Sequence, residues 1–302
     1  MITFHSLTFL SVFLLTLTFI LPGQTNAGVN ICTERPASAF LEVGYSAQSR
    51  GKLNRSNSNV SSDIYSLNLM FQGAGSDSQS WLFGLGHQYT IFDFQNLDAQ
   101  TNGHQHTLYL PFFLHSKSNA NYFNFSLAPA LSVSSNILKQ PNQYNANALQ
   151  GLGSVVYQKK MSDAIDWLAG ICADHRFGNF RVYPLLGFKW NINHLWKTVI
   201  AYPDSELSHR LSDTIYWRLH IGPDGNQWHI KDKALQQSSE FSHEAYLAQW
   251  QLDWSVTPGF LITASLGLVF NAEYRFTLAN GEEVATEQDD STRTTVRVRW
   301  EF

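Results

Sequence analysis

The sequence predicts an all-β protein: a transmembrane, antiparallel, up-and-down β-barrel of about fourteen strands. Segments with alternating apolar and polar residues recur along the chain after residue 27. Successive side chains of a strand point to opposite faces, so a strand between lipid and a polar lumen requires this alternation. Charged residues make up only 15% of the chain and aromatic residues 14%. The mean hydropathy of -0.19 excludes a bundle of membrane-spanning helices.

The first 27 residues predict an export signal. Leu7 to Leu21 is nearly all apolar, Pro22-Gly23 ends that run, and Thr25-Asn26-Ala27 supplies small residues for cleavage. The run is shorter than the roughly 20 residues that a spanning helix needs. Because residues 2–20 contain no Lys or Arg, an uncleaved anchor stays open as the alternative. We expect a signal peptide at 1–27, a short periplasmic segment at 28–39 and a barrel at 40–302.

The candidate strands follow one another along the rest of the chain. The first eight are expected at 41–47, 65–71, 81–89, 108–114, 123–133, 149–157, 167–171 and 182–190. Three more, at 195–202, 213–221 and 226–232, have weaker patterns. If the region 213–232 is a loop, the barrel has twelve strands instead. The last three, at 246–254, 260–270 and 292–302, alternate most clearly.

The last expected strand has the sharpest division between its faces. Val296, Val298 and Trp300 lie on one side, and Arg293, Arg297 and Arg299 lie on the other. This ending resembles the closing strand of bacterial outer-membrane β-barrels, in which a terminal Phe is the usual assembly signal. The resemblance gives that role to Phe302 and implies the barrel-assembly machinery as a partner.

The connections between the expected strands alternate between long and short. Long polar connections at 49–59, 93–103, 135–145 and 273–291 alternate with short ones, as in barrels whose two ends differ. On this topology six tryptophans fall at the periplasmic ends of strands. Because indole rings favour the membrane–water boundary, we expect them to form an aromatic girdle against outer-membrane lipid. They are Trp81, Trp167, Trp190, Trp196, Trp254 and Trp300.

One stretch of the chain resembles a family of uncharacterised, porin-like outer-membrane barrel proteins of Gram-negative bacteria. The likeness is carried by Tyr183-Pro-Leu-Leu-Gly-Phe-Lys-Trp190, by Asn191-Ile-Asn-His-Leu-Trp196 and by Tyr202-Pro203. That family is known only as a domain of unknown function. The resemblance therefore implies a barrel in the outer membrane and brings no catalytic residues. The stretch itself is typical of a hairpin with an Asn-rich tight turn, followed by Pro where the ladder ends.

Charged residues on the expected inner face are the candidate functional set. A cationic ladder would bias a pore toward anionic solutes. The alternative is a network of ion pairs that fills a narrow lumen, because buried charges need partners. The sequence leaves both interpretations open. The lumen-facing candidates are Arg293, Arg297, Arg299, Glu42, Glu273 and Arg275.

Other residue types give weaker patterns. Export would place Cys32 and Cys172 in an oxidising compartment, but with no geometry to support a bond we expect two separate thiols. His104-Gln-His106 puts two imidazoles on one strand face, with no Cys or carboxylate close in sequence to complete a metal site. We expect no metal, no cofactor and no catalytic residues. The net charge of -4 gives no indication of nucleic-acid binding.

These patterns predict a monomeric outer-membrane barrel whose leading function is a passive pore for small solutes. Fourteen strands enclose a wider lumen than the eight strands whose side chains fill it, and no plug domain is expected before residue 40. The alternative is a sealed barrel with a structural or surface-interaction role. An outer-membrane lipid-modifying enzyme is the third possibility, and it would need a Ser-His-acid triad on the barrel wall.

Overall fold

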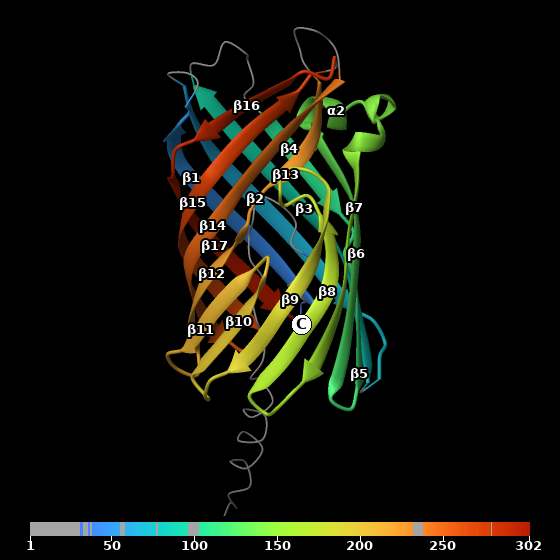
Figure 1. The fold of residues 1–302 in the computed structure, drawn as a ribbon, viewed down its shortest axis with the longest axis vertical. Coiled ribbons are helices and arrows are strands. Elements are labelled where there is room, and N and C mark those ends of the chain that lie inside the picture. Colours follow the sequence, from blue (N-terminus) through green and yellow to red (C-terminus); the bar gives the residue numbers. More distant parts are fainter. Residues whose placement is uncertain are drawn as a thin grey trace, which may run out of the picture.

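The computed structural model describes residues 31–32, 36, 38–54, 58–76, 78–95, 103–231, 238–278 and 280–302. Their strands form one antiparallel barrel, with its long axis vertical in Figure 1. It is closed because β1 (Phe40–Lys52) pairs with both β2 (Asn59–Gln72) and β17 (Ser291–Glu301). The expected signal peptide at 1–27 lies outside the described residues. Within them, no helix is both long and apolar enough to cross a bilayer.

The described chain has 17 strand segments, and three pairs of these segments each form one continuous wall strand. β4 (Gly103–Tyr109) and β5 (Phe112–Ser118) lie end to end between β3 (Gln79–Gln95) and β6 (Asn121–Ser134). β12 (Ile215–Pro223) and β13 (Asn226–Lys231) both pair with β14 (Ser238–Thr257). β16 (Glu283–Gln288) and β17 both pair with β15 (Phe260–Thr277). The barrel wall therefore has fourteen strands, as predicted.

The remaining strands are β7 (Leu149–Lys160), β8 (Ile165–Asp174), β9 (Arg181–Asn191), β10 (Trp196–Tyr202) and β11 (Ser205–Arg210). Between β6 and β7 lie α2 (Ser135–Leu138), η1 (Pro141–Gln143) and η2 (Ala146–Ala148). We call the end that carries α2 the loop end. The opposite end, where short connections such as 119–120 and 258–259 join the strands, is the turn end.

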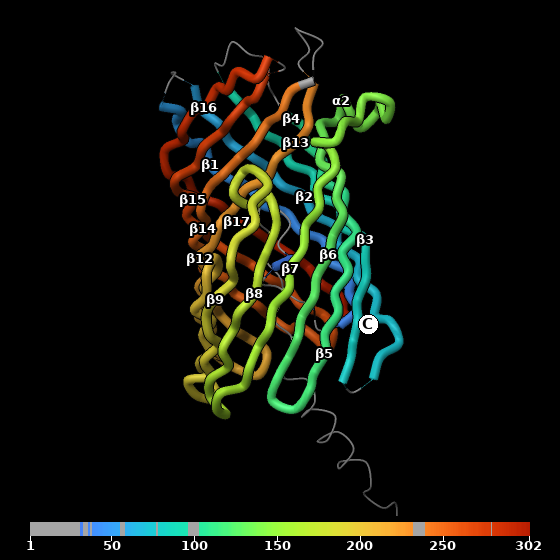
Figure 2. The backbone as a smooth tube through the Cα atoms, turned by 45° about the vertical axis from the view of Figure 1, so that its right-hand side comes forward, coloured from blue at the N-terminus to red at the C-terminus, as the bar shows by residue number. Residues whose placement is uncertain are grey.

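The two sides of the barrel differ in height. The tall wall comprises β14 to β17 and β1 to β3, with strands as long as the 20 residues of β14. The short wall comprises β8 to β11, which have 10, 11, 7 and 6 residues. In Figures 1 and 2 the short-wall hairpins end well below the loop end. Toward the loop end, β13 reaches β6 through a parallel bridge, His229 to Val133.

The region from 203 to 232 differs from the expected topology. The segment 203–212, expected to be a loop, contains β11, which pairs with both β10 and β12. The expected turn at 222–226 is a break inside one wall strand, because β12 and β13 pair with successive parts of β14 in the same direction. One strand was missed and one strand was counted as two. The predicted number of strands is therefore right, although these strands were assigned to the wrong residues. Residues 202–203 are joined by a cis peptide bond.

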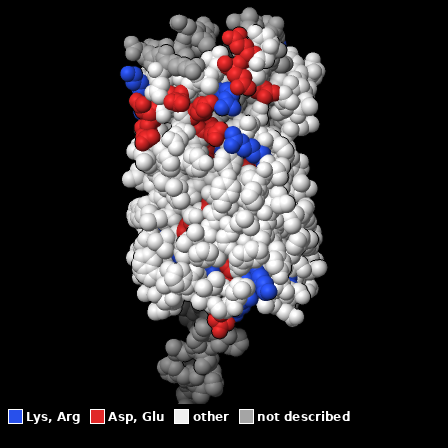
Figure 3. All heavy atoms as spheres, in the orientation of Figure 1, with Lys and Arg blue, Asp and Glu red and all other residues white. Residues whose placement is uncertain are grey.

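The tall-wall strands extend beyond the expected boundaries. β15 continues to Thr277 and pairs there with β16, within the stretch 273–291 that was expected to be a loop. Beyond Asn271 the inward face of β15 passes to Ala272 and Tyr274, both buried, so the alternation of residues 260–270 does not continue in phase. Figure 3 shows that Lys, Arg, Asp and Glu gather near the two ends of the visible face and are almost absent from its middle.

Candidate solute path in the barrel interior

The inner face of β17 carries the three closing-strand arginines, and all three are buried. Arg299 lies opposite Glu42 in the β1–β17 ladder. Its Nε and Nη2 donate to Oε2 of Glu42 at 2.9 and 2.6 Å. The guanidinium carbon lies 4.3 Å from the centre of the Phe40 ring. A buried ion pair therefore joins the first and last strands on the interior side.

Arg293 has a carboxylate partner far from it in sequence. Its Nη1 lies 2.7 Å from Oδ2 of Asp224, which stands in the break between β12 and β13. The contact is an ion pair without the geometry of a hydrogen bond. Its Nη2 donates to Oε1 of Gln48 at 2.8 Å. The ion pair thus reaches past β14 and β15 inside the barrel and neutralises the charge of Arg293.

Arg297 differs from both of its neighbours on the inner face. Its Nη2 donates to Oε1 of Gln251 at 3.0 Å. Its Nε and Nη1 are buried and have no hydrogen-bond partner among the described residues. Gln251 in turn donates to Asp253, whose carboxylate is paired with Arg218 at 2.8 Å. Arg297 is therefore the closing-strand arginine with the least compensated charge, and an anion inside the barrel would be attracted most strongly to it.

Glu273 and Arg275 do not join this interior set. β15 has one more residue than β14 between the pairs Tyr246–Phe270 and Glu244–Glu273, and Asn271 has a φ of 51°. Such a bulge reverses which side chains point inward. Beyond it Tyr274 is fully buried, while Glu273 and Arg275 are only half-buried and pair with each other at 2.6 Å. The strand alternation alone placed both residues on the wrong face.

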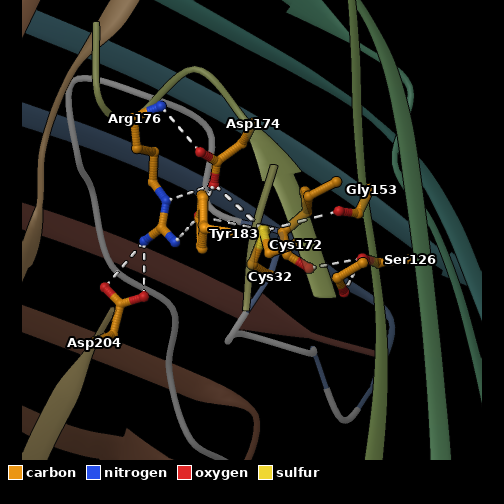
Figure 4. Close-up of a disulfide and its surroundings, with 10 residues drawn as sticks. Cys32, Ser126, Gly153, Cys172, Asp174, Arg176, Tyr183 and Asp204 are labelled. Carbon is orange, nitrogen blue, oxygen red and sulfur yellow. Dashed lines mark hydrogen bonds and ion pairs between the residues drawn. A yellow bond between two sulfur atoms is a disulfide. The ribbon is translucent and has the colours of Figure 1, made fainter. Parts of the chain in front are cut away.

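A second buried charge cluster lies at the tips of the short-wall hairpins. Nε of Arg176 donates to Asp174 at 2.8 Å, and its Nη1 lies 2.9 Å from both oxygens of Asp204. Its Nη2 donates to the hydroxyl of Tyr183 at 2.9 Å, and that hydroxyl donates to Asp174 at 2.6 Å. Arg176 therefore links the β8–β9 tip to the β10–β11 turn (Figure 4).

The residues of this cluster shift one another's pKa. Burial alone would raise the pKa of the Asp204 carboxyl, but the charge of Arg176 and the hydrogen bond with His220 lower it below its ordinary value. Burial would likewise lower the pKa of Arg176, and the two carboxylates instead hold it well above its ordinary value. Arg176 and Asp204 therefore form a charged pair in the folded barrel. Sequence reasoning missed it because Asp204 comes from a different hairpin than Asp174, Arg176 and Tyr183.

The amino-terminal segment enters the barrel. Cys32 and Cys172 form a disulfide with their Cα atoms 5.7 Å apart, so the expectation of two separate thiols was wrong. Ile31 and Cys32 lie inside the barrel rather than in the expected periplasmic position, because they pack with inward side chains of β1 to β9. Sγ of Cys32 lies 3.3 Å from Oδ2 of Asp174. As a disulfide sulfur it has no proton to donate there, so this is a contact rather than a hydrogen bond.

The tryptophans of the expected girdle gather at the turn end. Each lies close to the turn end of its strand in β3, β8, β9, β10, β14 or β17. Trp217 lies at the same level in β12. It was missed because the expected strand at 213–221 ran toward the turn end, whereas β12 runs away from it. Phe302 is exposed beyond β17. The six predicted residues are Trp81, Trp167, Trp190, Trp196, Trp254 and Trp300.

The remaining candidate chemistry consists of a histidine pair and one pocket. Nδ1 of His106 lies 3.1 Å from Nε2 of His87, and its Nε2 lies 2.8 Å from the hydroxyl of Ser135. A pocket of about 290 Å³ lies beside η2 and β7 and contains His175, Gln150 and Glu240. Its lining includes no Ser, Thr or Cys, so it supplies no nucleophile for a hydrolase triad.

Comparisons with known proteins give one family and several barrels. The family model described as a domain of unknown function, DUF6268, matches residues 35–301. The structure is similar to the COG4313 outer-membrane channel of Pseudomonas putida F1 (10% identity, 94% of this chain, 100% of that chain, TM-score 0.49). It is also similar to the P. putida toluene transporter TodX (10% identity, 89% and 91%, TM-score 0.43). A third similar structure is the KdgM porin with oligogalacturonate (10% identity, 86% and 99%, TM-score 0.37). No curated protein matches the chain.

Proposed function

This chain belongs to the DUF6268 family, and from that premise we propose that it is an outer-membrane channel for small solutes in a Gram-negative bacterium. The observation that carries the proposal is the reversed polarity of the closed barrel. Its inner face holds buried charges such as Arg297 and Glu42. Its outer face exposes large apolar side chains such as Leu85 and Leu266, at 49% and 54%.

The apolar outer face supports a position in a bilayer. In water such a surface would be costly to expose and would promote aggregation. In lipid it is favourable, and a closed ladder leaves no strand edge unpaired. The tryptophans at the turn end match the aromatic residues that flank the apolar band of membrane barrels. We assign Phe302 as the signal for the assembly machinery on the same basis.

The polar inner face supports a path for solutes. A barrel of fourteen strands is wide enough to enclose more than its own side chains, whereas eight strands are filled by them. Part of the interior is lined by buried Arg, Gln, Ser and Thr, and apolar clusters that include Phe113 and Phe92 lie beside this polar lining. The ion pairs and residues 31–32 narrow this interior. We therefore propose that the interior passes ions and small polar molecules rather than large substrates.

The alternative is a sealed barrel that acts at the surface through its loops. The paired charges of Arg293 and Arg299 favour it, because a satisfied network can fill a lumen without serving transport. A liposome-swelling assay separates the two functions. Purified protein in liposomes is exposed to an iso-osmotic pentose and, as a control, to a large dextran. We expect swelling with the pentose and none with the dextran. Absence of swelling with folded protein would contradict the channel and leave the sealed barrel.

A further inference from the structure

We propose that the chain narrows its own pore: Ile31 and Cys32 form a partial plug that the Cys32–Cys172 disulfide holds in the interior. The inference deepens the proposed channel function and rests on it. It concerns the described residues at 31–32, which lie far in sequence from the β8 strand that they join. The width of the solute path is then set by the tethered segment as well as by the side chains of the wall.

The packing around the plug spans the interior. Ile31 and Cys32 are 3% and 5% exposed. They belong to one apolar cluster with Phe40 of β1, Met70 of β2 and Leu152 of β7, among others. These side chains come from wall strands on different sides of the barrel. A segment packed into this cluster lies inside the barrel, in the space that a solute would cross.

Polar contacts fix the height of the plug. The hydroxyl of Ser126 donates to the carbonyl of Ile31 at 2.8 Å and lies 2.7 Å from the hydroxyl of Ser154. On the other side, Cys172 precedes the buried Asp174–Arg176 pair at the tip of the short wall. Figure 4 shows the disulfide between these two groups. The plug is therefore anchored to β6 by a hydrogen bond and to β8 by a covalent bond.

The covalent bond explains why so short a segment can stay in place. Burial of one apolar side chain and one hydrogen bond is comparable to the entropy lost when a free chain end is ordered. Contacts of that size would let the segment leave the barrel often. The disulfide removes that freedom, and its sulfur atoms are inaccessible because Cys172 is fully buried. The tether thus turns a weak contact into a lasting constriction.

Single-channel conductance in planar bilayers tests the plug. The mature chain is compared with the double variant Cys32→Ala/Cys172→Ala. As a matched control, Ser46→Ala removes an interior hydrogen bond to Thr295 of 2.8 Å that does not involve the plug. We expect the double variant to conduct at least about threefold more than the parent, because passage depends on the open dimensions of the pore. Ser46→Ala should leave conductance unchanged.

The other outcomes separate the two proposals. Equal, measurable conductance in the parent and the double variant would overturn the plug while the channel stands. No current from any folded variant would overturn the channel itself and the plug with it. Heat-modifiable gel migration verifies folding in each case. If the double variant fails to fold, Cys32→Ala alone cuts the tether without changing a wall residue, and the same threefold rise is expected.

Discussion

The tall and short walls of this barrel are stabilised by different means. Between β14 and β15 the ladder runs from Glu240–Thr277 to Thr257–Phe260, with two register shifts. β10 and β11 share only the pairs from Trp196–His209 to Ile200–Ser205. The short wall instead gains a buried arginine with two carboxylate partners and a disulfide. A long ladder stabilises its wall mainly through its many backbone bonds, whereas short hairpins depend more on side chains that meet inside the barrel.

The largest predicted effect is the loss of Arg176 from the short wall. Arg176→Ala would leave Asp174 and Asp204 buried without their cation, which costs about 3–5 kcal/mol in the free energy of unfolding. Urea denaturation of the barrel in detergent micelles, followed by tryptophan fluorescence, measures it. A loss below about 1 kcal/mol, the level of an exposed ion pair, would show that the cluster does not hold the short wall.

The corresponding change in the tall wall should cost less. Arg299→Gln removes a buried pair with Glu42, but the nine residue pairs of the β1–β17 ladder remain. We expect a loss of about 2–3 kcal/mol, the size of hydrogen bonds to a charged group. The same denaturation series compares it with Arg176→Ala. If Arg299→Gln proves the more damaging of the two, the proposed difference between the walls is wrong.

A smaller effect is expected from pH, and it arises at the tip of the short wall. Burial lowers the pKa of His175 to about 4, against a weaker opposing effect of Asp174. The imidazole stays neutral in the folded barrel but takes a proton in the unfolded chain below about pH 6.5. Stability should therefore be complete above pH 6.5 and fall between pH 6.5 and 4, by at most about 3 kcal/mol.

Two variants check this assignment. His175→Gln cannot titrate and should remove the loss of stability between pH 6.5 and 4. Asp204 acts at lower pH, because its depressed pKa makes the barrel lose stability as the pH falls below about 4. An Asp204→Asn variant should therefore lose less stability than the parent in that lower window. An unchanged profile in His175→Gln would rule out the histidine as the source of the upper transition.

The smallest effect is expected at the turn end. Arg210 pairs with Asp213 at the edge of the short wall, and the Asp213 side chain is largely exposed. Arg210→Ala should cost no more than about 0.5 kcal/mol, as is usual for exposed ion pairs. It serves as the matched control for Arg176→Ala, because both remove an arginine from the same wall. A cost of several kcal/mol would mean that any loss of charge destabilises the short wall.

The sequence predicted the strands whose apolar face meets lipid, including β8, β9 and β10 of the short wall, but it missed β11, for a physical reason. Residues 260–270 alternate because one face of β15 meets lipid, so a local pattern reveals the strand. β11 is Ser-Glu-Leu-Ser-His-Arg and has no such pattern. Asp224-Gly225 is typical of a tight turn, yet it interrupts a continuing strand.

The interior contacts could not be predicted because they join distant parts of the chain. The disulfide spans 140 residues, and Arg293 meets Asp224 across two intervening strands. Alternation placed Arg293, Arg297, Arg299 and Glu42 on one inner face, and the structure buries all four side chains. It failed for Glu273 and Arg275 because a single bulge at Asn271 changes the face of every later residue.

The reversal potential across a planar bilayer under a salt gradient tests most directly whether solutes pass through this interior. Arg297 is buried inside the barrel, and among the described residues it has no carboxylate partner. Only ions that pass close to it can sense its charge. If they do, Arg297→Gln will shift the reversal potential toward cation selectivity relative to the parent. An unchanged reversal potential with undiminished current would contradict passage through the interior.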